Sequence, residues 1–306
     1  MSAPSRSTFP LVPRYRLSGL PFGGAPSLRR GHGSDVAGSR AYVRGDPIST
    51  IDWRASARLS TALGRDEFVV RERYAEEAPR VVIVCDRRPG MAAFGSPLPW
   101  LDKATAMRHA AELIIESALL VGGFVGYLDY GSGSAYWVPP RGGRRLAELR
   151  QDRLPSDEFS APADSLERTL AHLAEHRRSV TSGSFVFVLS DFLPLPSEKV
   201  WLAALEHRWD LVPIVIQDPM WEQSFPDVSG IVVPLREPGS RHRLPVRLKP
   251  REVELRRAEN QDRLEALVAG FEAVDIDPVL ISTSDRAGIL AAFLDWSELR
   301  RGRRAA

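Results

Sequence analysis

The chain contains a single cysteine, Cys85, so no intrachain disulfide can form. This scarcity suits a reducing compartment, and we expect the protein to be cytoplasmic. No apolar run reaches ~18 residues without a charge, and the N-terminus lacks a cationic stretch followed by an apolar one. The sequence therefore predicts neither a membrane span nor a secretion signal. Cys85 lies in a β-branched run, where a thiol is typically a small buried hydrophobe and not a nucleophile.

The chain also lacks a strong net charge, since its formal value is +2 at pH 7. Such a balance demands no nucleic-acid partner, and we expect none. Arginine-rich stretches lie at 141–153, 236–251 and 300–304, and the first two are interrupted by Glu148, Asp152 and Glu237. We interpret these stretches as solubilising surface. Nucleic-acid binding stays open as an alternative, which a steep loss of affinity with salt would reveal. Most basic residues are arginine; the lysines are Lys103, Lys199 and Lys249.

Complete catalytic motifs are missing as well. The turn Gly131-Ser-Gly-Ser134 lacks the Gly-Lys-Ser/Thr ending of a phosphate-binding loop, and no Gly-x-Ser-x-Gly elbow is present. The stretch His172-Leu-Ala-Glu-His176 matches the H-x-x-E-H of inverted zinc peptidases. However, Leu166, Leu170 and Leu173 define the buried stripe of this predicted helix, so both histidines point away from it, toward solvent or a flank. We therefore favour a solvated helix face over a zinc peptidase.

From residue 81 onward the sequence alternates strand and helix patterns. Residues 81–86 form a continuous β-branched run, as in a central parallel strand covered on both faces. A helix pattern at 101–120 follows, with its apolar residues on one stripe. Further strands are predicted at 124–128, 135–138, 185–189, 211–216 and 278–281, and further helices at 164–178, 197–208, 251–274 and 285–299. This order predicts an α/β fold with a doubly wound, mostly parallel sheet.

The same patterns divide the chain into four parts. We predict a mobile N-terminal tail over 1–27, a β extension over 28–80, an α/β domain over 81–299 and a second tail over 300–306. Residues 218–250, rich in proline and arginine, are predicted as a small β insertion before the last helices.

The segment 40–58 carries the most distinctive pattern, because arginine and aspartate alternate there with aromatic and aliphatic residues. Gly45 can take positive φ and Pro47 fixes its own φ, which predicts a strand, a tight turn and then a short helix or strand. The alternation favours a partly buried ion-pair network over a solvated face. The characteristic residues are Arg40, Tyr42, Gly45, Asp46, Asp52, Trp53, Ala57 and Arg58.

Together with Ile51, Ala55, Ser56, Glu72 and Asp86 at their spacing, these residues resemble the bacterial family called domain of unknown function 58. The resemblance covers most of residues 28–235. Members of that family are similar to von Willebrand factor A domains and tend to be encoded beside AAA+ ATPases of the MoxR type. The resemblance therefore implies a sheet of von Willebrand A type and an ATPase partner.

A von Willebrand A domain carries a metal-ion-dependent adhesion site at the carboxyl ends of its strands. Its first loop contains Asp-x-Ser-x-Ser, a second loop supplies a threonine and a third an aspartate, and these hard oxygen ligands suit Mg²⁺. In this chain, Asp86 and the pair Ser190-Asp191 match the first and third loops. The two serine positions hold Arg88 and Gly90, and the threonine position falls near Asp164.

This departure changes the expected chemistry. Arg88 can place its guanidinium where the cation would lie and pair with Asp86 or Asp191. Because two carboxylates alone seldom make a tight Mg²⁺ site, we expect a degenerate site and no firm cofactor. Mg²⁺ bound by Asp86 and Asp191 is the disfavoured alternative.

The resemblance thus implies a non-enzymatic adaptor that works with a MoxR-type AAA+ ATPase in the maturation or assembly of other proteins. Asp86, Arg88 and Asp191 are expected to face the partner, and segment 40–58 to brace the β extension or form a second contact surface. The sequence does not name the client protein. The alternative is a metal-assisted hydrolase that uses the strand-end aspartates or the pair His172 and His176, and turnover would distinguish the two.

Overall fold

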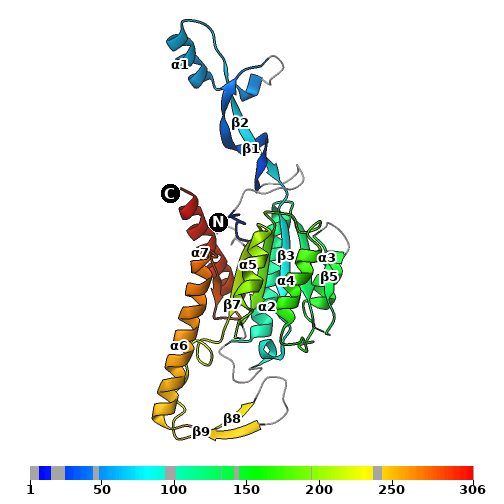
Figure 1. The fold of residues 1–306 in the computed structure, drawn as a ribbon, viewed down its shortest axis with the longest axis vertical. Helices are drawn as coiled ribbons and strands as arrows, with labels where there is room; N and C mark the ends of the chain where they lie inside the picture. Colours follow the sequence, from blue (N-terminus) through cyan, green and yellow to red (C-terminus); the bar gives the residue numbers. More distant parts are fainter. Residues whose placement is uncertain are drawn as a thin grey trace, which may run out of the picture.

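The computed structural model describes residues 7–14, 25–43, 48–93, 101–131, 133–140, 145–193, 195–236 and 243–305. Its centre is a six-stranded sheet with the order β10-β7-β6-β3-β4-β5 (Figure 1). Neighbouring strands are parallel except β4 and β5, which pair antiparallel as a hairpin. The expected α/β class with a mostly parallel sheet is confirmed. The strands are β3 (Arg80–Cys85), β4 (Phe124–Asp129), β5 (Tyr136–Val138), β6 (Phe185–Ser190), β7 (Asp210–Ile216) and β10 (Val279–Ile281).

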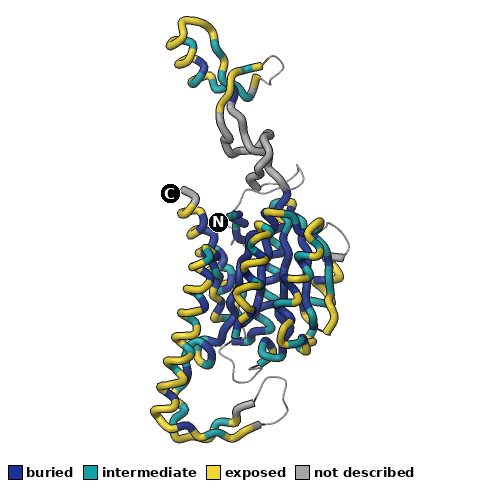
Figure 2. The backbone as a smooth tube through the Cα atoms, viewed as in Figure 1, coloured by how far each residue is buried: buried dark blue, intermediate teal, exposed yellow. Residues whose placement is uncertain are grey.

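Helices cover both faces of this sheet, and the central strands are buried on both sides (Figure 2). Along β3, Val81 and Ile83 face one apolar core, whereas Val82 and Val84 face the other. This double burial explains the continuous β-branched runs in the sequence. The first core is covered by α2 (Lys103–Leu120) and α7 (Arg286–Ala305) and the second by α4 (Ser165–Glu175), α5 (Glu198–Glu206) and the end of α6 (Pro250–Ala273).

The start of α2 is set by a side-chain cap. The carboxylate of Asp102 accepts hydrogen bonds from the backbone nitrogen of Thr105 at 3.0 Å and from its hydroxyl at 2.7 Å. A cap of this kind satisfies backbone donors that a helix start leaves unpaired. It places Lys103, the first residue of α2, in a buried position. The short segments that link the larger elements are η2 (Pro89–Ala92), α3 (Arg145–Glu148) and η3 (Leu149–Arg153).

The predicted β extension is an arm built from β1 (Ala25–Ala41) and β2 (Val69–Glu77), which pair antiparallel in a sheet of their own. At its far end lie η1 (Ile48–Thr50) and α1 (Trp53–Leu63) (Figure 1). Asp52 caps α1 by accepting from the backbone nitrogens of Arg54 and Ala55, both at 3.1 Å. The short helix after the turn is therefore present.

The side chains of the arm differ in one respect from expectation. Arg40, Arg54 and Arg58 are exposed, so a partly buried ion-pair network is wrong for these three. Tyr42 and Trp53 instead pack edge-to-face against Phe68, with ring centroids 6.3 and 6.1 Å apart. Aromatic packing and the Asp52 cap thus hold this end of the arm together. Ala57 is exposed on α1, while Gly45 and Asp46 lie outside the described residues.

The predicted β insertion is present. It contains two short strands, β8 (Val232–Arg236) and β9 (Arg243–Arg247), which pair antiparallel. They precede α6, and a small apolar cluster of Phe225, Leu248 and Val253 lies at their base. In the described part of the chain, no helix has the length and apolar character that crossing a membrane requires.

Parts of both predicted tails, 1–27 and 300–306, pack against the domain. Phe9 is 3% exposed and stacks on Phe293 of α7, with ring centroids 4.3 Å apart. At the other end, α7 continues to Ala305, and Arg300 is buried with its guanidinium 2.9 Å from the carboxylate of Asp210. The tail prediction is therefore wrong for residues 7–14 and 300–305, because Phe9 packs on α7 and α7 itself continues to Ala305. The remaining residues of the predicted tails, apart from those at the start of β1, lie outside the described ranges.

Candidate functional site

The candidate site lies at the carboxyl ends of β3 and β6, in the middle of the sheet. From β3 the chain passes to β4 on one side and later returns to β6 on the other, so strand order reverses here. Ligands of open α/β sheets bind at such a reversal. Asp86 follows β3, and Ser190 and Asp191 stand at the end of β6. The backbone nitrogen of Asp86 donates to the Leu189 carbonyl at 2.9 Å, which keeps the two strand ends together.

Asp86, Arg88 and Ser190 form one buried group. The Asp86 carboxylate accepts from the backbone nitrogen of Arg88 at 2.9 Å, which folds the loop back on itself. The guanidinium of Arg88 donates to the same carboxylate through Nε at 2.9 Å and Nη2 at 2.6 Å. The Ser190 hydroxyl donates to Asp86 Oδ2 at 2.7 Å. The pairing that the sequence suggested for Arg88 is thus present, and it is a charge-assisted, two-nitrogen contact.

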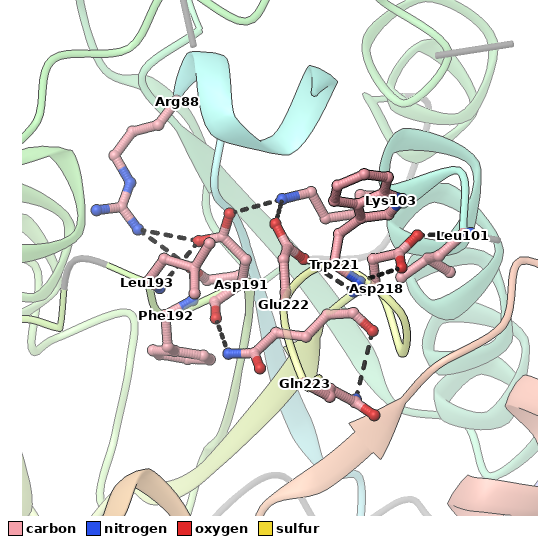
Figure 3. Close-up of polar contacts among 12 residues, drawn as sticks. Arg88, Leu101, Lys103, Asp191, Phe192, Leu193, Asp218, Trp221, Glu222 and Gln223 are labelled. Carbon is pink, nitrogen blue, oxygen red and sulfur yellow. Dashed lines mark hydrogen bonds and ion pairs between the residues drawn. The ribbon is translucent and has the colours of Figure 1, made fainter. Parts of the chain in front are cut away.

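Asp191 and Lys103 form the second group, which Figure 3 displays. The Lys103 ammonium donates to Asp191 Oδ2 at 2.9 Å and to Glu222 Oε1 at 2.6 Å. Arg88 Nη2 also lies 3.9 Å from Asp191 Oδ1, so the two groups touch. The Lys103 side chain is fully buried, and it is the cation shared by two carboxylates.

The electrostatics of this group follow from burial. Burial alone would lower the pKa of Lys103, but Asp191 and Glu222 outweigh it, so the pKa lies above the ordinary lysine value. Burial raises the pKa of Glu222, and the Lys103 ammonium opposes that shift without cancelling it. The two carboxylates therefore favour the charged form of Lys103, and the site contains a buried cation at neutral pH.

The loop after β7 holds Glu222 in place. Glu222 Oε2 accepts from the backbone nitrogen of Asp218 at 2.8 Å, and Asp218 Oδ2 accepts from the backbone nitrogen of Leu101 at 3.1 Å. Gln217 donates its side-chain nitrogen to the Asp191 carbonyl at 2.6 Å. These contacts, also visible in Figure 3, join the loop to the start of α2 and to the end of β6. Asp218 therefore has a structural role in this loop.

Gly90 lies close to the site for a steric reason. A Cβ atom at this position would lie 3.2 Å from Asp191 Oδ2, tighter than an ordinary contact. Asp164 behaves differently, because its carboxylate is about half exposed and pairs with Arg168 of the same helix at 2.8 Å. Its side chain makes no described contact with Asp86 or Asp191. The structure thus brings together five of the six predicted site residues and leaves Asp164 outside.

Asp86, Arg88 and Asp191 do not face outward toward a partner, contrary to the expectation from the sequence, because all three are buried. Asp86 is 1% exposed, Arg88 5% and Asp191 3%. A partner cannot touch these side chains directly in this conformation, because other side chains cover them. Their hydrogen bonds hold together the loops that follow β3 and β6.

The sequence analysis missed Lys103 and Glu222. Both are as deeply buried as the predicted residues. One signal was available, since lysine is rare in this chain and a buried lysine must have acidic partners. The arrangement can hold protons and charges in place, but its oxygens are already bonded to Lys103 and Arg88. Oxygens from Asp86, Ser190, Asp191 and Glu222 are the ones that a metal would use if both cations moved away.

A group of buried polar side chains lies beside Cys85, but the thiol's chemistry is set mainly by its burial. Tyr127 donates its hydroxyl to Asp129 Oδ2 at 2.6 Å, and Arg87 donates to the Tyr127 oxygen at 3.3 Å and to the Arg153 carbonyl at 2.7 Å. Burial is the main cause that raises the pKa of the Cys85 thiol to about 12. Because only a thiolate is an effective nucleophile, Cys85 is unreactive in the folded protein.

The fold and this strand-end site define an α/β protein with a buried, charge-compensated cluster at the centre of its sheet. A family model described as "Protein of unknown function DUF58" matches residues 38–265, and the chain belongs to that family.

The relatives found in curated collections are similar over most of their length. The chain is 26% identical over 239 residues to the uncharacterized protein Rv1480 of Mycobacterium tuberculosis, a match that covers 76% of this chain and 70% of that protein. It is equally similar to the uncharacterized protein Mb1516 of Mycobacterium bovis. Among solved structures, the conserved hypothetical protein BatB from Bacteroides thetaiotaomicron aligns with 73% of this chain and 99% of that chain, at 15% identity and a TM-score of 0.41.

Proposed function

We propose that this protein is a von Willebrand A-type, protein-binding adaptor that works with a MoxR-type AAA+ ATPase in the maturation or assembly of other proteins. The observation that carries the proposal is the charge compensation at the strand ends. Lys103 and Arg88 supply positive charge where an adhesion site of this type holds Mg²⁺. The ATPase partner and the maturation role rest on the family resemblance.

Charge compensation supports a strand-end cluster that needs no bound cation. In an adhesion site, Mg²⁺ is held by hard oxygens and keeps one position for a carboxylate of the partner. Here Asp86 Oδ2 already accepts from Arg88 and Ser190, and Asp191 Oδ2 accepts from Lys103. A Mg²⁺ ion would have to displace two buried cations, which is costly. The site is therefore assembled at all times and independent of divalent ions.

The contact surface has to be formed by exposed residues. The end of the arm offers several, because Ile48 is 70% exposed, Trp53 60% and Leu63 52%. Figure 2 shows this end as mostly exposed and distant from the core. A group of exposed apolar side chains on one projecting element is typical of a protein-binding surface. We assign the arm to partner contact and the buried strand-end cluster to support of the sheet edge.

Affinity capture from the host of the protein tests the proposal. The tagged chain is incubated with host extract in ATP and Mg²⁺, and again in EDTA, and bound proteins are identified by mass spectrometry. We expect a AAA+ ATPase in both samples. Recovery only with Mg²⁺ could reflect the ATPase's own requirement for the ion or Mg²⁺ bound at the strand-end site. Asp86→Ala distinguishes the two, because this variant should capture the ATPase as well as the wild type does when the strand-end site holds no Mg²⁺.

Two variants localise the contact. Trp53→Ala should lower recovery of the ATPase, whereas Leu120→Ala, at an exposed apolar position on the end of α2, should leave recovery unchanged. Absence of any AAA+ ATPase from every sample would overturn the proposal. Metal-dependent turnover that is lost in Asp191→Asn would favour a hydrolase instead.

A further inference from the structure

His172, Glu175 and His176 lie together at the C-terminal end of α4, because residues three and four apart share one side of a helix. The two imidazole rings stack with centroids 4.2 Å apart and an angle of 20° between them. One potential ligand atom from each of the three side chains lies within 4.8 Å of the others. Trp137 of β5 packs against both rings, at 5.7 and 5.8 Å between centroids. The two histidines therefore point away from the buried leucine stripe of α4, toward its flank, as the sequence predicts.

The histidines have nitrogen atoms available for a ligand. His176 Nδ1 lies 2.9 Å from the His172 carbonyl oxygen. A carbonyl only accepts, so Nδ1 carries the proton and Nε2 has a free lone pair. In many metal-binding histidines, the ring nitrogen that does not face the metal donates to a carbonyl in this way. His172 Nε2 is buried and has no hydrogen-bond partner in the described part of the chain. A buried polar atom without a partner calls for an explanation, and a role as a metal ligand provides one.

Charge at this place also favours a cation. The exposed Glu175 supplies a negative charge. The carbonyl end of α4 adds negative potential, since His176 is the residue at which this helix ends.

We propose that His172, Glu175 and His176 form a surface site for a divalent transition-metal ion, with Zn²⁺ as the natural occupant. Two imidazole nitrogens and one carboxylate suit Zn²⁺, Cu²⁺ or Ni²⁺ and not Mg²⁺ or Ca²⁺, which prefer oxygen. Two ligands of a tetrahedral Zn²⁺ lie about 3.3 Å apart, so binding requires rotation of the side chains toward one another. The fourth position stays open for water or a partner's side chain.

Metal titration of the untagged protein tests this site. We expect one Zn²⁺ per chain by competition with a chromogenic chelator and no response to Mg²⁺. Cu²⁺ should quench the fluorescence of Trp137, and the quenched fraction should fall in Trp137→Phe. Binding should weaken below about pH 6, as protons compete for the imidazoles. His176→Ala should lower Zn²⁺ affinity by roughly tenfold or more, since it removes a direct ligand.

His207 offers a matched control. It also ends a helix, is half-buried and packs on a tryptophan, Trp209, at 4.7 Å between centroids. It belongs to no described group of three metal-ligating side chains. His207→Ala should therefore bind Zn²⁺ like the wild type. Glu175→Ala, at an exposed position, provides a second variant that is expected to fold and to bind more weakly. Equal Zn²⁺ binding by wild type, His176→Ala and Glu175→Ala, or no binding by wild type, would overturn the proposal.

Discussion

Replacement of Lys103 by methionine is the most informative perturbation of the strand-end cluster. Methionine retains most of the apolar stem and removes the ammonium that Asp191 and Glu222 share at 2.9 and 2.6 Å. Both carboxylates then stay buried without their cation. Removal of one partner of a buried ion pair costs about 3–5 kcal/mol, because the remaining charge is uncompensated. Since two carboxylates are affected, we expect a loss of about 4 kcal/mol in the free energy of unfolding at pH 8.

The loss should depend on pH in a defined direction. Lys103 has a raised pKa, so it stays protonated from pH 5 to pH 8 and its own titration adds no pH dependence in that range. The pKa of Glu222 is raised by burial, and removal of Lys103 raises it further. A carboxyl group whose pKa is raised in the folded protein costs no stability below its pKa in the unfolded chain, about 4.3. It destabilises the fold increasingly as pH rises from that value to the raised pKa of the folded state. The penalty of Lys103→Met should therefore be smaller at pH 5, by about 1 kcal/mol or more.

Urea denaturation at both pH values measures this effect without adding salt that would screen the charges. Lys199→Met is the matched control, because Lys199 is exposed on α5, and its effect should stay within about 0.5 kcal/mol. Adding Glu222→Gln to Lys103→Met should recover part of the loss, since one of the two uncompensated charges is removed. A penalty below about 1 kcal/mol at pH 8, or one that is equal at both pH values, would refute the role of Lys103 as the resident cation.

Arg88→Met should lower the free energy of unfolding by about 3 kcal/mol in the same assay, because Asp86 keeps only hydrogen bonds from uncharged groups; a loss below about 1 kcal/mol would contradict the pairing. The Cys85 thiol should be essentially unreactive toward a disulfide reagent at pH 8 and should react at once in denaturant, since its raised pKa leaves only about one thiolate in ten thousand; fast labelling of the native protein would contradict its burial. Phe9→Ala should cost about 3 kcal/mol and make residues 7–14 sensitive to protease, because Phe9 stacks on Phe293; unchanged proteolysis would show that this segment is not docked.

The fold could be predicted because its signals are local. The β-branched run at 81–86 indicates a strand covered on both faces, and β3 is buried as expected. The apolar run at 185–189 indicates a strand as well, and β6 is buried throughout. The ends of parallel strands meet at one edge of a sheet, so Asp86 and Asp191 could be placed together from sequence alone. Their pairing with Arg88 followed from simple charge complementarity.

The remainder of the site depends on contacts between distant parts of the chain. Lys103 lies 88 residues from Asp191 and 119 residues from Glu222, and neither spacing leaves a periodic signal. Burial of the cluster was also hidden, since charged residues are usually exposed. The ordered terminal segments could not be predicted for the same reason, because their contacts join distant parts of the chain. Phe9 and Arg300 look like members of short terminal segments, but α7 carries Phe293 to Phe9 and carries Arg300 to Asp210.

The measurement that tests the central claim most directly is a calorimetric titration of the protein with Mg²⁺, with Asp86→Ala alongside. If Lys103 and Arg88 are the resident cations, the wild type should give no saturable heat through the low millimolar range. The variant should behave identically. A saturable isotherm in the wild type that vanishes in Asp86→Ala would show a working metal site and contradict the account.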